Sequence, residues 1–541
     1  MLSRCELDSG PSAGCLHGSA TTAFITNDDQ HVHMAVEADS EQESSAYDRL
    51  MERVRKLNNV GNAAGILSWD QQVMMPDEGT PARSQQLSTL SSIQHDILTD
   101  EETGDLIEAA ESEDLTDEQA AAVREVRREY ERQTSVPNDL VTEISETTSE
   151  ALPAWKEAKA ESDFETFAPY LEKLLDLKRQ YAEHIDPDRD PYEVLFEEFE
   201  PCLPLEQAEE ILADVREQLV PMIAEIRESD TDLAVDTFHG EFPADEQEEL
   251  VRDALDTLGY PWERGRLDTA PHPFSSGTQF DARVTTRFDE SDPIGALMST
   301  IHEFGHATYT LGLPDEHYGT PLGESRDLSV HESQSRLWEN HVGRSKAFWE
   351  LFLPTFQAHF PSTADASVED AYEAANQVFE DNLIRVEADE LTYHMHILVR
   401  FEIERELLSG DLAVEDVPEV WNDKYEEYLG IRPENDAEGC LQDIHWSHGS
   451  FGYFPTYSLG SIMAAQLYDA ASDDIEDIEE KTRAGEFDPL REWLREHVHQ
   501  HGARYETNDL VRAATGEDFT ADYFLDYVTE KYGDLYDLDA A

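Results

Sequence analysis

The chain contains 541 residues, of which 39 are lysine or arginine and 120 are aspartate or glutamate, so its formal net charge is -81. This acidic excess excludes a general nucleic-acid or anionic-membrane binder, because phosphate-rich partners require a basic face. A hydrophobic fraction of 39% is enough to build large cores, which excludes a wholly disordered chain.

Residues 1–40 show no helical period and are rich in serine, glycine, aspartate and histidine. This composition predicts a disordered N-terminal extension, with Met34 as an alternative start of the protein. From Tyr47 onward, apolar residues return every three or four positions, and helical patterns dominate to about residue 260. Because no repeat of fixed period and no long low-complexity linker follows, we expect one mainly α-helical domain over residues 41–541.

The segment 279–288 departs from the helical pattern, since it is rich in β-forming residues that partly alternate in polarity. It predicts a β-strand with Asp281, Arg283 and Thr285 on one face. Because this strand directly precedes the next motif, we expect it to offer its edge to an extended peptide.

A helix predicted to start at Asp292-Pro293 carries the sequence HEFGH at residues 302–306. With 3.6 residues per turn, the two histidines stand ~40° apart on one face, so both imidazoles can reach the same ion. Glu303 is rotated by ~100° from His302, beside the ion, and this suits a base that acts on water.

The third metal ligand is expected on a second helix, in the segment 330–340. Glu332 is the first candidate, since it would complete a set of two histidines and one carboxylate with a position left open for water. His331 competes from the same turn, although neighbouring residues on a helix point ~100° apart. The nitrogen and oxygen donors favour Zn2+, with Co2+ or Mn2+ as substitutes.

These residues belong to a series of motifs: HPFSSG at 272–277, DARVT at 281–285, HEFGH at 302–306, HESQS at 331–335, IRVEAD at 384–389 and GCLQDIHW at 439–446. Together with SWDQ at 68–71, the series resembles the carboxypeptidase Taq family of zinc metallocarboxypeptidases over roughly residues 45–535. The resemblance implies a mostly helical body divided by a deep active-site groove, a small β-sheet beside the metal-binding helix, and a homodimer.

The resemblance also implies hydrolysis of the last peptide bond of substrates that have a free C-terminal carboxylate, with broad specificity. The zinc ion on its three ligands would activate a water, and Glu303 would carry the water proton to the leaving amine. His445 and Tyr457 are expected to stabilise the oxyanion, and Tyr453 is the alternative.

A guanidinium recognises a terminal carboxylate with two parallel hydrogen bonds. Arg385 of the IRVEAD motif is the first candidate for this role, and Arg283 and Arg432 compete with it. The other residues expected to bind substrate either support the loops that close the groove or hold the strand and the substrate backbone: Asp389, Gln442, Asp443, Asp281, Arg283 and Thr285.

The compartment is predicted from charge and cysteines. Few of the basic residues are lysine, which, with the acidic excess, is typical of proteins adapted to molar salt, where charges are screened over ~3 Å. The four cysteines form no CxxC pair and are too few for a disulfide framework. Without a long apolar stretch or a secretion signal, we expect a cytoplasmic protein of a halophile.

Two alternative functions stay open at the level of the sequence. An oligopeptidase or endopeptidase would use the same HExxH chemistry to cut peptides internally. A non-catalytic acidic binding protein would keep the HExxH pattern as a relic of a metal site. Cleavage products and the activity of a Glu303 variant distinguish these alternatives from a carboxypeptidase.

Overall fold

Helices make up most of what the computed structural model describes, which is residues 44–231, 233–235, 238, 240–379 and 381–538. The mainly α-helical class predicted from the apolar periodicity is therefore confirmed. Residues Ser45–Ala541 form one compact unit, whereas the expected disordered extension at 1–40, with Met34, lies outside the described residues. Among the described helices, none is long and apolar enough to cross a bilayer.

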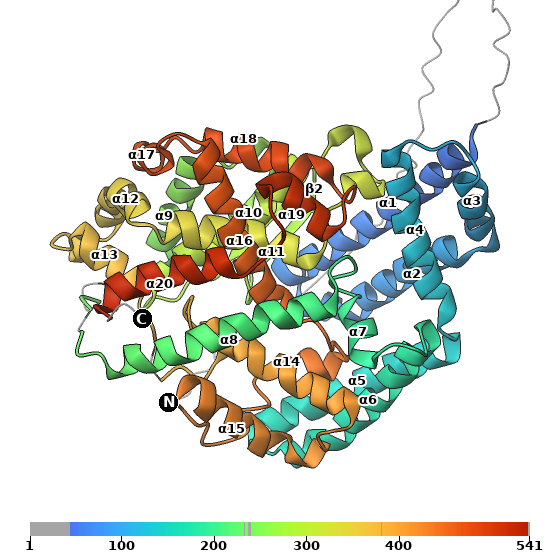
Figure 1. Cartoon of the computed structure of the whole chain (residues 1–541), viewed down its shortest axis with the longest axis horizontal. Coiled ribbons are helices and arrows are strands. Elements are labelled where there is room, and N and C mark those ends of the chain that lie inside the picture. The colour runs from blue at the N-terminus through green and yellow to red at the C-terminus, as the bar shows by residue number, and fades with distance from the viewer. Residues whose placement is uncertain (1–43, 232, 236–237, 239, 380, 539–541) are drawn as a thin grey trace, which may run out of the picture. The chain divides into compact units, whose positions relative to one another are not determined.

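The first four helices are α1 (Ala46–Val73), α2 (Thr80–Thr99), α3 (Glu101–Glu111) and α4 (Asp117–Ser135). Helices α1, α3 and α4 pack around an apolar cluster of their own, which Leu322 joins from another part of the chain, and α2 packs against α1. The four helices lie together in Figure 1. Side chains cap their starts, because Ser45 accepts a backbone hydrogen bond ahead of α1 and Thr116 forms a capping box with Gln119 ahead of α4.

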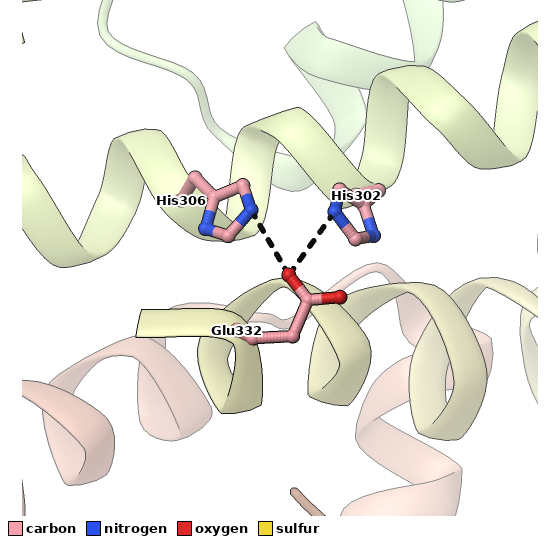
Figure 2. A group of neighbouring side chains, drawn as sticks. All are labelled: His302, His306 and Glu332. Carbon is pink, nitrogen blue, oxygen red and sulfur yellow. Dashed lines mark ion pairs between the residues drawn. The ribbon is translucent and has the colours of Figure 1, made fainter. Parts of the chain in front are cut away.

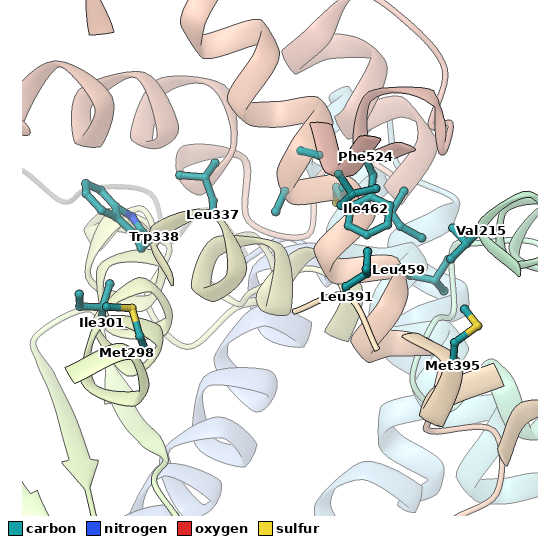
Figure 3. Packing of buried hydrophobic residues seen from close by; sticks show 14 of the residues in the cluster. Val215, Met298, Ile301, Leu337, Trp338, Leu391, Met395, Leu459, Ile462 and Phe524 are labelled. Carbon is teal, nitrogen blue, oxygen red and sulfur yellow. The ribbon is translucent and has the colours of Figure 1, made fainter. Parts of the chain in front are cut away.

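The later helices surround a second, larger apolar core. Their bounds are α5 (Asn138–Glu161), α6 (Phe164–Ile185), α7 (Pro191–Phe196), α8 (Leu205–Glu228), α9 (Ala244–Leu258), α10 (Pro293–Gly312), α11 (Leu328–Arg336), α12 (Lys346–His359), α13 (Val368–Ala375), α14 (Tyr393–Ser409), α15 (Val417–Leu429), α16 (Pro455–Asp474), α17 (Ile478–Ala484), α18 (Asp488–His497), α19 (Thr507–Thr515) and α20 (Asp522–Tyr536). Figure 3 shows Met298 of α10, Ile462 of α16 and Phe524 of α20 within this core. Because each such buried side chain contributes about 1.5–3 kcal/mol, the central helices α10 and α16 are firmly anchored.

A small sheet lies beside α10, as the family resemblance implies. Within the described residues it has three strands in the order β1 (Leu267–Thr269), β3 (Asp281–Thr286) and β2 (Ser275–Thr278). Strand β3 pairs in parallel with β1 and antiparallel with β2, and α10 packs against β2 and β3. The strand predicted at 279–288 is therefore β3. The expectation that it offers its edge to a peptide is wrong, because both of its edges are already paired.

The two faces of β3 differ as the sequence predicts over its first four residues. Asp281 and Arg283 are half-buried, whereas Ala282 and Val284 are buried. Thr285 is buried too. Its buried hydroxyl is paired, because it accepts from the Phe274 amide at 2.9 Å and donates to the Phe274 carbonyl at 3.0 Å. These bonds fix the HPFSSG segment to the strand.

Candidate functional site

His302, His306 and Glu332 converge where α10 meets α11, as Figure 2 shows. Glu332 Oε2 lies 3.6 Å from His302 Nε2 and 3.4 Å from His306 Nε2. One ligand atom from each residue lies within 4.8 Å of the other two. Two adjacent turns of α10 and one turn of α11 thus place three donor atoms around a single point.

Two glycines allow the helix backbones to approach closely at this point. A Cβ atom on Gly305 of α10 would lie 2.5 Å from the Gln334 carbonyl oxygen. A Cβ atom on Gly460 of α16 would lie 2.5 Å from Glu332 Cβ. Both distances are too short for non-bonded atoms, so a larger residue at either place would push α11 out of position. Backbone packing therefore sets the position of Glu332.

The donor set fits a divalent ion. With bonds of ~2.1 Å and tetrahedral angles, two ligand atoms stand about 3.4 Å apart, close to the distances that Glu332 Oε2 makes with the two imidazoles. His331, the competing ligand, lies elsewhere. Its ring Nδ1 and its carbonyl oxygen lie 2.7 Å and 3.1 Å from Nδ1 of His306, the ring nitrogen that does not face Glu332. His331 therefore supports His306 from behind.

A second carboxylate, Glu339 of the π-helix η6 (Leu337–Gly343), orients His302. Its Oε2 lies 2.9 Å from His302 Nδ1, and it accepts hydrogen bonds from Arg336 at 3.1 Å and Arg344 at 2.8 Å. Because Nδ1–H of His302 donates to Glu339, Nε2 keeps its lone pair for an ion. Sequence reasoning missed Glu339 and Arg336. Their spacing of seven and four residues from Glu332 was the available signal, since it places them on the same helix face.

The surrounding charges set the protonation of these groups. Burial would raise the pKa of Glu332, but Arg336 and the two imidazoles lower it well below its usual range. Burial would lower the pKa of His302, but the carboxylates of Glu332 and Glu339 raise it. The site therefore keeps an anionic oxygen ligand, which favours a bound cation.

Glu303 lies beside this cluster, and one oxygen of its carboxylate is unpaired among the described residues. Its residue is only 5% exposed, and Oε2 has no hydrogen-bond partner among the described residues. Buried polar atoms are almost always paired, so an unpaired one points to a functional use. Burial also raises the pKa of Glu303, which makes it a better proton acceptor than an exposed carboxylate.

The two later motifs meet around Arg385, which begins the short helix η8 (Arg385–Glu387). Its Nε and Nη2 lie 3.0 Å and 2.9 Å from Asp443 Oδ1, and its Nη1 donates to the Tyr393 hydroxyl at 3.1 Å. Gln442 accepts from the Arg385 amide at 2.9 Å and donates to the Leu383 carbonyl at 3.0 Å. Gln442 and Asp443 thus hold the segment that carries Arg385.

His445 and the tyrosines adjoin this arrangement. The His445 ring lies 5.4 Å from that of Tyr453, which lies 5.2 Å from that of Tyr457. The Arg385 guanidinium stands 5.2 Å over the Tyr457 ring. A link to the metal cluster runs through Tyr393, because the Arg336 guanidinium stands 4.9 Å over its ring.

The other predicted substrate residues are occupied elsewhere in the fold. Arg283 pairs with Asp281 at 2.6 Å and lies 4.4 Å over the Trp69 ring, which joins α1 to the sheet. Arg432 is exposed and pairs with three surface carboxylates. Asp389 accepts from the amide and the hydroxyl of Thr392, in the turn that precedes α14. Of the three competing arginines, the structure brings Arg385 together with His445 and Tyr457.

Comparisons with known proteins show which family the chain is similar to. The model of the carboxypeptidase Taq (M32) metallopeptidase family matches residues 49–532. Thermostable carboxypeptidase 1 of Thermus thermophilus is 38% identical over 506 residues, covering 91% of this chain and 99% of that protein. Thermostable carboxypeptidase 1 of Pyrococcus furiosus is 39% identical, covering 90% and 98%. The solved M32 carboxypeptidase of Deinococcus radiodurans R1 superposes with a TM-score of 0.88 at 38% identity, covering 91% of this chain and 100% of that one.

Proposed function

Because the chain belongs to the carboxypeptidase Taq (M32) metallopeptidase family, we propose that it removes single residues from the C-terminus of varied peptides with one Zn2+ per chain. It is a metallocarboxypeptidase with peptide substrates, and the proposal concerns its ion, its catalytic groups and its anchor for the substrate. The observation that carries the proposal is the convergence of His302, His306 and Glu332 beside the free carboxylate oxygen of Glu303.

His302, His306 and Glu332 would hold the ion. Their donor types support zinc, with Co2+ or Mn2+ as substitutes. When bound, the ion supplies Lewis acidity, which lowers the pKa of water and polarises the scissile carbonyl. Arg336 keeps Glu332 ionised, and Glu339 keeps the ring of His302 turned toward the ion.

Glu303 is the proposed general base. Its Oε2 is free to take a proton from water and to pass it to the leaving amine. Since burial raises the pKa of Glu303, the carboxylate binds a proton more readily than an exposed glutamate does, and this helps the first of the two transfers.

His445 and Tyr457 are the proposed donors to the oxyanion. Burial lowers the pKa of His445 to about 4 and raises the pKa of Tyr457 well above its usual value. At neutral pH the imidazole is therefore uncharged and the phenol keeps its proton. Both groups can then donate a hydrogen bond to the oxyanion as neutral donors. Tyr453 stays the alternative, because its ring lies 5.2 Å from that of Tyr457.

Arg385 is the proposed anchor for the substrate carboxylate. Asp443 pairs with Arg385 through Oδ1 at 2.9 Å and with Arg400 of α14 through Oδ2 at 2.6 Å. Two buried guanidinium groups thus share one carboxylate. Glu404 does not cancel the excess at neutral pH, because burial raises its pKa to about 8. A terminal carboxylate would neutralise the remaining positive charge, which favours substrates with a free C-terminus.

The test is mass spectrometry of peptide products in molar KCl, with and without a chelator and added zinc. We expect single residues to leave one after another from the C-terminus, an effect that the chelator abolishes and zinc restores. A peptide whose C-terminus is amidated should be cut much more slowly. Internal fragments, or equal rates on amidated peptides, would show an endopeptidase instead.

The assembly and environment are part of the same proposal. We expect a homodimer of single-domain chains over residues 41–541, working in the cytoplasm of a halophile, where molar salt screens the net charge of -81. Light scattering after size-exclusion chromatography in 3 M KCl should give twice the chain mass. Dialysis to low salt should unfold the protein, and a fold that stays intact there would contradict the halophilic assignment.

A further inference from the structure

Helix α14 places two fully buried ionisable side chains, Arg400 and Glu404, one turn apart, behind the proposed substrate residues. Arg400 and Glu404 are each 0% exposed, and neither belongs to the motifs that identify the family site. Charged groups are rarely buried without a partner, because losing water is costly. Their partners therefore indicate what the two side chains do.

Arg400 acts on Asp443. Its Nε donates to Asp443 Oδ2 at 2.6 Å, and its Nη1 donates to the His396 carbonyl at 2.5 Å. The guanidinium also lies 4.6 Å over the Trp421 ring, which holds its plane. Since Arg385 binds the other oxygen of Asp443, the orientation of that carboxylate, and so of Arg385, depends on Arg400.

Glu404 acts on the segment between His445 and Tyr453. Its Oε1 accepts from Trp446 Nε1 at 2.9 Å, and its Oε2 accepts from the Gly452 amide at 3.0 Å. Both ends of segment 446–452 are thus bonded to one carboxyl group. At Gly452 the backbone has a φ of 86°, and a Cβ atom there would lie 2.7 Å from the Phe196 amide nitrogen, so the turn depends on glycine.

We infer that Arg400 and Glu404 are positioning residues with separate tasks in the proposed reaction, Arg400 for the anchor Arg385 and Glu404 for the oxyanion donors His445 and Tyr457. The inference rests on the proposed function. It assigns substrate recognition to Arg400, through its bond to Asp443, and the chemical step to Glu404, through its bonds to Trp446 and Gly452. A simple structural role would lower the apparent kcat through the amount of folded enzyme and leave KM unchanged, so kcat must be referred to folded, zinc-loaded enzyme.

The test compares kcat and KM of two variants on a peptide with a free C-terminus. Arg400→Met removes the second positive charge, so we expect KM to rise about 10-fold with kcat nearly unchanged. Glu404→Gln keeps the shape but turns one acceptor into a donor that faces an N–H group. We expect kcat to fall about 10-fold with KM nearly unchanged, because the two donors shift out of place.

Two further variants allow the same test if Arg400→Met or Glu404→Gln does not fold. Arg400→Lys keeps the charge and should raise KM less than Arg400→Met does. Trp446→Phe removes one donor to Glu404 and should lower kcat in the same direction as Glu404→Gln. Zinc content and unfolding temperature are measured for every variant, so that kinetic constants refer to folded, metal-loaded enzyme.

Equal changes in kcat and KM for both positions, or unchanged kinetics in folded variants, would overturn the inference. The proposed function fails by a different result, namely a parent enzyme that does not release C-terminal residues or an equally active Glu303→Gln variant. An active parent whose α14 variants show no division between kcat and KM would therefore reject the inference alone.

Discussion

The two sides of the candidate site are built in different ways. The metal side consists of His302, His306, Glu332, Glu303 and Glu339, and it stands on α10, α11 and η6, which lie within one stretch of sequence. The carboxylate side consists of Arg385, Gln442, Asp443, His445 and Tyr457, and it comes from η8, the segment 439–446 and the start of α16.

Different forces hold these two sides. Close backbone packing at Gly305 and Gly460 sets the position of Glu332 on the metal side, and side-chain hydrogen bonds only turn the imidazoles of this side. Side-chain hydrogen bonds, such as those of Gln442 and Asp443, fix the carboxylate side. We therefore expect single polar substitutions to leave the metal side folded, even where they weaken zinc binding, and to disturb the geometry of the carboxylate side.

The largest effect is expected on the metal side from Glu303→Gln. Removing the general base should lower kcat about 10²- to 10⁴-fold, while zinc content stays near one per chain, because Glu303 does not belong to the group of three donors. The measurements are peptide hydrolysis and metal analysis of the purified variant. Loss of zinc together with activity would mean that Glu303 is a metal ligand, and this would contradict its role as the general base.

Glu339→Gln tests the support behind the metal side. The amide holds His302 less strongly than the carboxylate that now accepts at 2.9 Å, so zinc affinity should weaken about 10- to 100-fold. Competition with a chelator of known affinity measures this, and excess zinc should restore most activity. Glu419→Gln, at an exposed ion pair with Arg432, is the matched control and should bind zinc like the parent.

Arg385→Met tests the carboxylate side. The rate constant kcat/KM for peptides with a free C-terminus should fall about 10- to 100-fold, and the slow cleavage of amidated peptides should change little. Arg432→Met is the control, because Arg432 is exposed and pairs with surface carboxylates. If both variants lost activity equally, or if amidated peptides were affected as strongly, Arg385 would not be the anchor.

Salt should have the smallest effect of these tests. It should weaken zinc binding on the metal side and strengthen the binding of acidic peptides on the carboxylate side. The net charge of -81 attracts a divalent cation and repels a peptide carboxylate over a distance that falls from ~10 Å at 0.1 M to ~3 Å at 1 M salt. Raising KCl over this range should weaken zinc binding a few-fold and lower KM for acidic peptides a few-fold. Because low salt should unfold the protein, the comparison uses only the KCl concentrations within this range at which circular dichroism shows a folded protein. Changes of the same sign would contradict this electrostatic account.

The same division explains what the sequence could predict. The helical class, the short strand and the shared face of His302 and His306 follow from periodicities of two and 3.6 residues, which depend on local backbone geometry. Glu332 is predicted as the third ligand from its chemistry, and it reaches the two histidines through the close packing of α11 against α10 and α16. Arg400 and Glu404 could not be predicted in this way. Their partners Asp443 and Gly452 lie more than 40 residues along the chain, and only tertiary packing decides which buried charge meets which loop.

The expectation about the strand edge failed for a related reason. Alternation along 281–286 identifies a strand and its faces, but nothing in that segment shows how many neighbours the strand has. The motif resemblance already favours Arg385 over Arg283 and Arg432, and the fold adds what no local pattern shows, namely that Arg385 lies over the Tyr457 ring.

The most direct test of the central claim is an anomalous scattering measurement at the zinc absorption edge on crystals grown with zinc. The account predicts one strong peak, ~2.0–2.2 Å from His302 Nε2, His306 Nε2 and a carboxylate oxygen of Glu332. A peak at another place, or one bound by His331 or Glu339 in place of Glu332, would contradict it.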